Sequence, residues 1–211
     1  MALVPRTRSD YAEHMLFQVR IHGRGGQGVV TAAELLSVAA FREGRQAQAF
    51  PSFGSERTGA PVVAFCRIAD HEIRAHEPIA RPDALIIQDP TLLHQVDLFS
   101  GISEDGYLLI NSSLGFTELG IDDLATRFQP SRMVAVPASE IARETVRRPI
   151  ANAVLLGGFA ALTAVISLES VIAAIRDRFS GQLADGNVAG AERAFEFVAH
   201  QIQEVVGAQA G

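Results

Sequence analysis

The sequence predicts an α/β fold: a three-layer sandwich with a mixed, mostly parallel central sheet covered by helices. First, short apolar runs of strand length alternate with helix-like segments from residue 16 onward, a pattern typical of α/β layers. Second, a glycine turn at 23–28 joins an apolar run to a long apolar-rich segment, in the order strand, turn, helix. Third, the helix expected at 27–42 has only a narrow polar stripe, as helices that cover a sheet do.

The first strand is expected at 16–22, directly before the glycine turn. Further strands are expected where apolar runs recur, at 46–50, 61–68, 84–88, 107–111 and 133–137. The segment 72–74 is expected to continue the strand at 61–68 or to pair with it antiparallel, which would make the sheet mixed. Helices are expected to end at about residue 99 and to start at residue 139 and at about residue 149.

The uncharged stretch 150–168 reaches the length of a membrane-spanning helix. It contains Asn152 and the pair Gly157-Gly158, and no aromatic belt or one-sided basic flank follows it. We therefore expect a buried helix or a helix–helix interface and no membrane span. The small side chains at Gly157 and Ala161 would let another backbone approach closely.

An amphipathic helix is expected at the C-terminal end, beginning near Asp185 or Asn187, either of which would cap it. Its apolar residues recur at alternating spacings of three and four: Val188, Ala191, Phe195, Val198, Ile202 and Val205. This stripe is expected to pack on its own domain or on another subunit.

The length of 211 residues suits one domain, which we place at 15–211. Residues 1–14 are expected to be a flexible N-terminal extension or a tag outside the fold. Leu3 to Arg6 resemble a thrombin-type cloning scar, and Met15 would serve as a start. A natural extension is the alternative.

The composition excludes several classes of function. The net charge of −6 and the pI near 5.5 argue against nucleic-acid binding, which usually needs a basic surface. One cysteine, Cys66, allows neither a disulfide framework nor an iron–sulfur cluster held by this chain alone. The six histidines show no metal-ligand spacing, and no serine or cysteine nucleophile motif is present. The N-terminus has no secretory signal, so we expect a cytoplasmic protein.

The glycine turn has the spacing G-x-G-x-x-G, which suits a phosphate at a helix N-terminus. A nicotinamide cofactor would also need an acidic residue at the end of the second strand, to hold the ribose. The chain has Gln46 to Pro51 there and no acid until Glu56. Three interpretations stay open: a phosphate of another ligand, a nicotinamide cofactor, or a turn that only packs at a subunit interface.

Two further places could contribute to a ligand site. The loop 53–59 supplies the cation Arg57 and two hydroxyl groups, which suit a phosphate oxygen, although a solvated loop would look the same. Asp89 and the pair Asn111-Ser112 follow two predicted strands, at the edge where ligands bind in open α/β sheets. Turn and cap roles are the favoured interpretation of these residues.

Several motifs resemble the gamma subunit of 2-oxoacid:ferredoxin oxidoreductases, over residues 16 to about 200. They are G-R-G-G-Q-G-V-V-T at 23–31, Q-A-F-P-S-F-G-S-E-R at 48–57, G-A-P-V-V at 59–63, P-D-A-L-I-I-Q-D-P at 82–90, L-I-N-S-S at 109–113 and N-A-V-L-L-G at 152–157.

The resemblance implies a non-redox subunit without catalytic residues or a metal of its own. Thiamine diphosphate, Mg and [4Fe–4S] clusters would sit on other subunits, namely alpha, beta and ferredoxin-like delta chains. The assembly would convert a 2-oxoacid to acyl-CoA and CO₂ and reduce ferredoxin or another acceptor. This chain would cover the active site and help to bind coenzyme A. The implied coenzyme A-binding residues are Gly23, Gly25, Gly26, Gln27, Gly28, Ser55 and Arg57.

The second motif departs from many relatives at two positions, and one of these departures lowers its positive charge. Many relatives have a second arginine where this chain has Thr58, and glycine where it has Ala60. Two alternatives therefore remain: a purely structural assembly subunit, and a stand-alone NAD(P)-dependent oxidoreductase.

Overall fold

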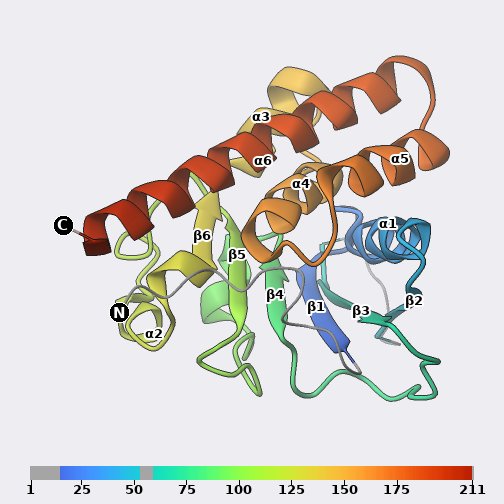
Figure 1. Cartoon of the computed structure of the whole chain (residues 1–211). Helices are drawn as coiled ribbons and strands as arrows, with labels where there is room; N and C mark the ends of the chain where they lie inside the picture. Colours follow the sequence, from blue (N-terminus) through green and yellow to red (C-terminus); the bar gives the residue numbers. More distant parts are fainter. Residues whose placement is uncertain (1–14, 53–58, 211) are drawn as a thin grey trace.

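The computed structural model describes residues 15–52 and 59–210, which form a six-stranded sheet with its long helices on one face (Figure 1). The strands follow the order β2-β3-β1-β4-β5-β6. Their bounds are β1 Leu16–Arg24, β2 Gln46–Pro51, β3 Pro61–Ala69, β4 Ala84–Ile87, β5 Tyr107–Asn111 and β6 Met133–Val136. β3 runs antiparallel to β1 and β2, whereas β1, β4, β5 and β6 are mutually parallel. The predicted α/β fold with a mixed, mostly parallel sheet is confirmed.

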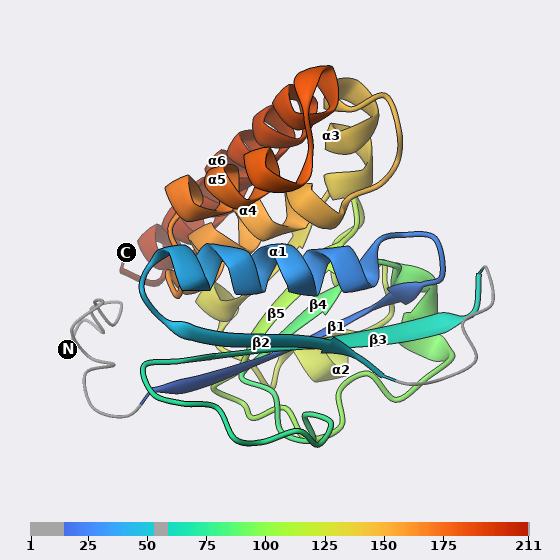
Figure 2. The ribbon, with the colours of Figure 1, turned by 90° about the vertical axis from the view of Figure 1, so that its right-hand side faces the viewer.

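The helices are α1 Val29–Arg42, α2 Asp122–Ala125, α3 Ala138–Thr145, α4 Asn152–Thr163, α5 Leu168–Arg178 and α6 Gly181–Ala210, with 3-10 turns η2 Pro90–His94 and η3 Pro130–Arg132. α1, α3, α4, α5 and α6 lie on one face of the sheet, and α2 lies on the other (Figure 2). α4 is buried along almost its whole length, between the sheet and α6. The expectation of a buried helix in 150–168 is therefore confirmed. No helix in the described ranges combines the length and apolarity that crossing a membrane requires.

The opposite face differs from the helical layer that a three-layer sandwich implies. Short turns and connections cover it: η2, α2 and the segments that join the strands (Figure 2). They still bury an apolar cluster against the sheet, which includes Leu85 and Ile87 of β4 and Leu92 of η2. The connections are long enough to bury this face without forming long helices.

Three local predictions were wrong. The helix expected to end at about residue 99 is the short 3-10 turn η2, which ends at His94. The segment 72–74 is not a strand, because β3 is already paired on both sides by β1 and β2. α6 begins at Gly181, so Asp185 and Asn187 lie inside it and cap nothing; the side chain of Asn187 instead donates to the Leu183 carbonyl. The N-terminal segment 1–14 lies outside the described residues.

Two buried arginines fasten connections to the opposite face. Arg67 is 2% exposed and donates to the carbonyls of Glu77 (2.5 Å) and Ala75 (3.3 Å). Arg20 donates to the carbonyls of Leu98 (2.6 Å) and Ser100 (2.8 Å). A guanidinium offers several donors in a fixed geometry, so one side chain satisfies several main-chain acceptors of an irregular segment.

His22 lies on the same face, beside Ile87, and is 6% exposed. Burial and then the charge of Arg20 lower the pKa of His22 to about 3. The folded protein therefore keeps His22 neutral at pH values where the unfolded chain protonates it, below about 6.5. Because the unfolded state binds more protons there, acidification lowers the unfolding free energy by about 1.4 kcal/mol per pH unit through this group.

His22→Gln is expected to remove this part of the acid sensitivity, because glutamine does not titrate. Between about pH 6 and pH 4.5, the unfolding free energy should fall by about 2 kcal/mol less in the variant than in the wild type. Chemical denaturation at both pH values measures the difference. His200→Gln is the control, since the His200 side chain is 68% exposed. Equal falls in the wild type and His22→Gln would contradict the prediction.

Candidate functional site: the glycine turn

The turn between β1 and α1 requires glycine at two positions with backbone angles in the left-handed region. Gly26 has φ 94° and Gly28 has φ 73°. Gly28 is also the residue before the first turn of α1, and a Cβ there would lie 2.4 Å from Nδ2 of Asn152. The missing side chain thus lets the N-terminal ends of α1 and α4 meet.

Gly23 allows α1 to pack against the end of β1. A Cβ at Gly23 would lie 2.7 Å from Cγ2 of Val29 and 3.0 Å from Oε1 of Gln27. Gly23 therefore faces the interior of the turn, where it permits close packing.

Side chains of Arg24, Gln27 and Asp89 brace the turn. Oε1 of Gln27 accepts from the Arg24 N–H at 2.8 Å, and its Nε2 donates to Oδ2 of Asp89 at 2.7 Å. Nε of Arg24 forms an ion pair with the same oxygen at 3.2 Å. The Arg24 guanidinium also donates to Oγ1 of Thr91 (2.7 Å) and Oε1 of Gln95 (2.8 Å). The side chains of Arg24 and Gln27 therefore hold the shape of the turn.

Asp89 has the turn and cap role that the sequence favoured. Its Oδ1 accepts from the N–H of Thr91 at 3.0 Å and caps η2. Burial raises the pKa of Asp89, but the hydrogen bonds from Thr91 and Gln27 and the charge of Arg24 outweigh this effect. The pKa therefore lies below its ordinary value, and Asp89 is ionised at neutral pH.

Asn111 and Ser112 also have cap and turn roles: Asn111 accepts from the first turn of α3, and Ser112 holds a turn. Asn111 accepts from the N–H of Ser139 at 2.9 Å and donates to the Gln88 carbonyl at 2.8 Å. Oγ of Ser112 accepts from the N–H of Leu114 at 2.9 Å. Both side chains therefore organise the loops at this edge of the sheet.

The structure brings the end of the second motif to the turn. The N–H of Gly25 donates to the Ala60 carbonyl (2.9 Å), and the N–H of Gly59 donates to the Gly25 carbonyl (3.1 Å). Arg24 also donates to the Gly59 carbonyl at 3.0 Å. Ser55 and Arg57 lie outside the described residues. Gly59, which follows their segment directly, is fixed against the turn.

A hollow of about 310 Å³ lies beside the turn. It is lined by Arg24, Gly25, Gly26, Gly28, Val29, Val30, Thr31 and Val62. Apart from the adjacent residues of the chain, no described atom lies within 4 Å of the position that a Cβ of Gly26 would take, so this glycine faces open space. Nothing in the described chain accepts a hydrogen bond from the N–H groups of Gly26 and Gly28. The hollow therefore has N–H donors for an anion. Its volume is enough for only part of a nucleotide-sized ligand.

Other chemistry-bearing residues do not gather near the turn. Across residues 15–52 and 59–210, no three His, Cys, Asp or Glu side chains come together in a way that would hold a metal ion. Cys66 is fully buried in β3, and burial raises the pKa of its thiol. Cys66 therefore serves as a small apolar side chain of the core.

Sequence reasoning missed Arg24 and its ion pair with Asp89. Arg24 occupies a variable position of the glycine motif, and Asp89 is far away in the sequence. The pair forms because β1 and β4 are parallel neighbours that end side by side. No local pattern carries that information.

Sequence comparisons place this chain among known proteins. The family model for pyruvate ferredoxin/flavodoxin oxidoreductase matches residues 18–197. Pyruvate synthase subunit PorC of Methanothermobacter marburgensis is 43% identical over 185 residues, 88% of this chain and 99% of that protein. The pyruvate/ketoisovalerate oxidoreductases common subunit gamma of Pyrococcus abyssi is 45% identical over 181 residues, 86% of this chain and 96% of that protein.

Solved structures share the fold. Pyruvate oxidoreductase subunit PORC from Thermotoga maritima superposes with a TM-score of 0.72 at 33% identity, covering 86% of this chain and 96% of that chain. The 2-oxoglutarate:ferredoxin oxidoreductase from Magnetococcus marinus, at 17% identity and a TM-score of 0.62, contains the same fold in 31% of its longer chain. The resemblance seen in the sequence motifs is confirmed: the chain belongs to the pyruvate ferredoxin/flavodoxin oxidoreductase family, among its gamma-type subunits.

Proposed function

We propose that this chain is the non-redox gamma subunit of a multi-subunit 2-oxoacid oxidoreductase. The complex would oxidatively decarboxylate a 2-oxoacid to acyl-CoA and CO₂ and reduce ferredoxin or another acceptor. The observation that carries the proposal is the match to gamma-type subunits over 99% and 96% of their length. Thiamine diphosphate, Mg and [4Fe–4S] clusters would belong to alpha, beta and ferredoxin-like delta subunits. A cytoplasmic location is part of this proposal.

Within the complex, we assign to the glycine turn the binding of a phosphate of coenzyme A. The geometry supports this role because Gly26 faces open space and the first N–H groups of α1 border the hollow. Coenzyme A carries a pyrophosphate and a 3′-phosphate, so main-chain donors and a cation suit it better than a carboxylate would. The hollow is smaller than the whole ligand, which implies that other subunits complete the site.

The second candidate is a purely structural subunit, and one observation favours it. Arg24 and Gln27 already use their side chains to brace the turn. A stand-alone NAD(P)-dependent enzyme is the weakest candidate, because β2 ends at Pro51 without a carboxylate for the ribose.

Reconstitution of the complex tests the subunit assignment. A preparation with all subunits is expected to show pyruvate-dependent or other 2-oxoacid-dependent, coenzyme A-dependent reduction of a viologen dye. Omission of this chain should abolish the coenzyme A-dependent rate, and adding it back should restore it. Full coenzyme A-dependent activity without this chain would contradict the assignment, as would NAD(P)-dependent turnover by the chain alone.

Arg57→Ala in the whole complex is expected to raise the KM for coenzyme A about ten- to a hundredfold. The loss of one charge-assisted contact costs about 1.5–3 kcal/mol. Steady-state kinetics with coenzyme A varied at saturating 2-oxoacid measure the change. Arg74→Ala is the control, since that arginine is exposed and pairs with Glu72. An unchanged KM in Arg57→Ala would show that this loop does not bind coenzyme A, and would favour a purely structural subunit.

A further inference from the structure

The last turns of α6 extend past the edge of the sheet (Figure 1). Val198 is fully buried, whereas Ile202 and Val205 are half-buried and Val206 is 45% exposed. The apolar stripe of the helix therefore continues beyond the point where the described fold covers it. An apolar helix face that leaves its own domain marks an interaction surface.

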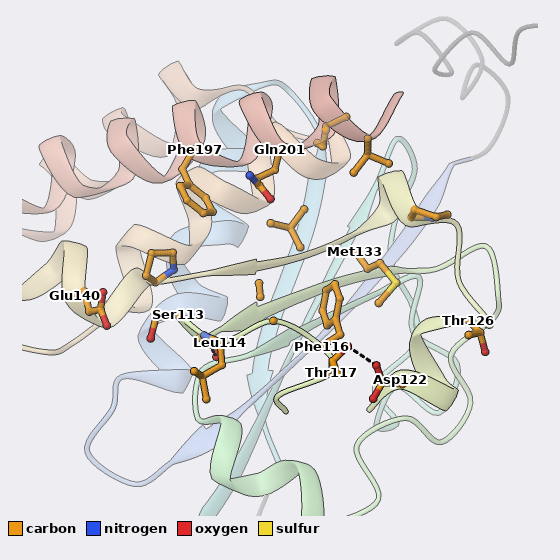
Figure 3. Close-up of a pocket in the computed structure, with 18 residues that line it drawn as sticks. Ser113, Leu114, Phe116, Thr117, Asp122, Thr126, Met133, Glu140, Phe197 and Gln201 are labelled. Carbon is orange, nitrogen blue, oxygen red and sulfur yellow. Dashed lines mark hydrogen bonds between the residues drawn. The ribbon is translucent and has the colours of Figure 1, made fainter. Parts of the chain in front are cut away.

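A groove of about 760 Å³ lies beneath this overhang, along β6 (Figure 3). Phe197 and Ile202 of α6 form one wall. The opposite wall is the segment 112–117, where Leu114 is 47% exposed and Phe116 lines the cavity. Both walls thus present apolar side chains to the groove, and β6 forms the floor between them.

β6 is the edge strand of the sheet, and part of its backbone points away from β5. The Val136 carbonyl accepts from the N–H of Ser112 at 2.9 Å, so Val136 faces β5. In a parallel strand, the main-chain N–H and C=O groups of alternate residues point to the same neighbouring strand. The main-chain groups of Met133 and Ala135 therefore point away from β5. Within the described chain, the main-chain groups of Ala135 have no hydrogen-bond partner. The edge can pair with one more extended chain.

Acidic side chains lie at both ends of the groove. Glu140 is at one end and Asp122 at the other (Figure 3). No Lys, Arg or His is among the described residues that line it. An apolar chain with a basic residue at each end would match this pattern.

We propose that an extended apolar segment of another subunit, with a Lys or Arg at each end, adds a strand to β6 in this groove. The inference rests on the proposed function, since the partner is another chain of the same complex. Main-chain hydrogen bonds to Ala135 give affinity, and the two apolar walls receive alternate side chains. A second copy of this chain fits less well, because an antiparallel β6–β6 pair would bring Glu140 of one copy toward Asp122 of the other.

Hydrogen exchange and paired variants test the docking. The amides of Met133 and Ala135, and those of 201–207, are expected to exchange at least tenfold more slowly in the complex than in the isolated chain. Leu114→Glu combined with Val205→Glu places one charge on each wall, at an exposed and a half-buried position, and should lower incorporation into the complex at least tenfold. Leu183→Glu is the matched control, since Leu183 is 44% exposed at the other end of α6. Unchanged circular dichroism of each isolated variant establishes that folding is intact.

Three results would overturn the docking. If the wild-type complex assembles normally without protection of the Met133 and Ala135 amides, the docking in the groove is contradicted and the subunit assignment is unaffected. Normal incorporation of the double variant would do the same. The same protection in a dimer of the isolated chain would assign the groove to a second copy. Failure of the wild-type chain to enter any 2-oxoacid oxidoreductase would instead overturn the proposed function, and with it the partner.

Discussion

Gly157→Val is expected to lower the unfolding free energy by at least about 3 kcal/mol, or to prevent folding. α4 and α6 approach so closely that a Cβ at Gly157 would lie 1.9 Å from the Ala191 carbonyl oxygen and 2.7 Å from its Cα. Backbone atoms of a packed helix cannot turn aside as a side chain can. The two helices would have to separate, and α6 would lose much of its packing on α4.

Gly158→Ala, one residue further on, is the matched control. Its Cβ would lie 3.2 Å from Cγ2 of Val198, the end of a side chain that can shift. Alanine also favours a helix over glycine by about 1 kcal/mol, so the net change should be small. Denaturant titrations of both variants measure the contrast. Equal stability of the two variants would contradict the close approach of α4 and α6.

Arg67→Met is expected to cost about 3 kcal/mol of unfolding free energy. Methionine keeps the apolar stem of the side chain but removes the donors to the carbonyls of Ala75 and Glu77. Those acceptors hold the connection 70–83 against the sheet, so amides of 71–80 should exchange faster.

Arg74→Met tests whether any arginine in this part of the fold has such an effect. Arg74 lies in the same connection, but it is exposed and pairs with Glu72. We expect little change in its unfolding free energy. If Arg67→Met is as stable as Arg74→Met, the connection is held by other contacts.

Local patterns predicted the strands well, because each buried strand is a short apolar run. Ala84–Ile87 and Tyr107–Asn111 are bounded by polar residues and turns, which fixes their ends within about a residue or two. The helix at Val29–Arg42 begins two residues later than expected, because Gly28 adopts a left-handed backbone angle.

Features that depend on tertiary contacts could not be predicted. The polar first turns of α6, from Gly181, lack the apolar stripe that identified the rest of that helix. The boundary between α4 and α5 depends on Ala164, which has φ 51°, a backbone angle that no pattern assigns to alanine.

In the candidate site, too, local patterns were predictable from the sequence and tertiary contacts were not. Glycine spacing after a strand located the turn, and the order of motifs located the family. The bracing by Arg24 and Asp89 needed the pairing of β1 with β4, and the position of Gly59 beside Gly25 needed that of β1 with β3. Contacts between distant segments are properties of the topology.

The most direct test of coenzyme A binding at the glycine turn uses complex that contains the Gly26→Ala variant. The quantity measured is its KM for coenzyme A. A methyl group at Gly26 would enter the open space beside the turn, where we place a phosphate. Gly44→Ala is the matched control: Gly44 has φ 78°, follows the other end of α1 and likewise has no described atom within 4 Å of its Cβ position. Both substitutions impose a similar backbone strain of about 1–2 kcal/mol.

We expect Gly26→Ala to raise the KM for coenzyme A about tenfold or more, a loss of about 1.4 kcal/mol of binding free energy, with Gly44→Ala unchanged. The same KM in the wild type and both variants, at equal subunit content, would contradict a role of the glycine turn in coenzyme A binding.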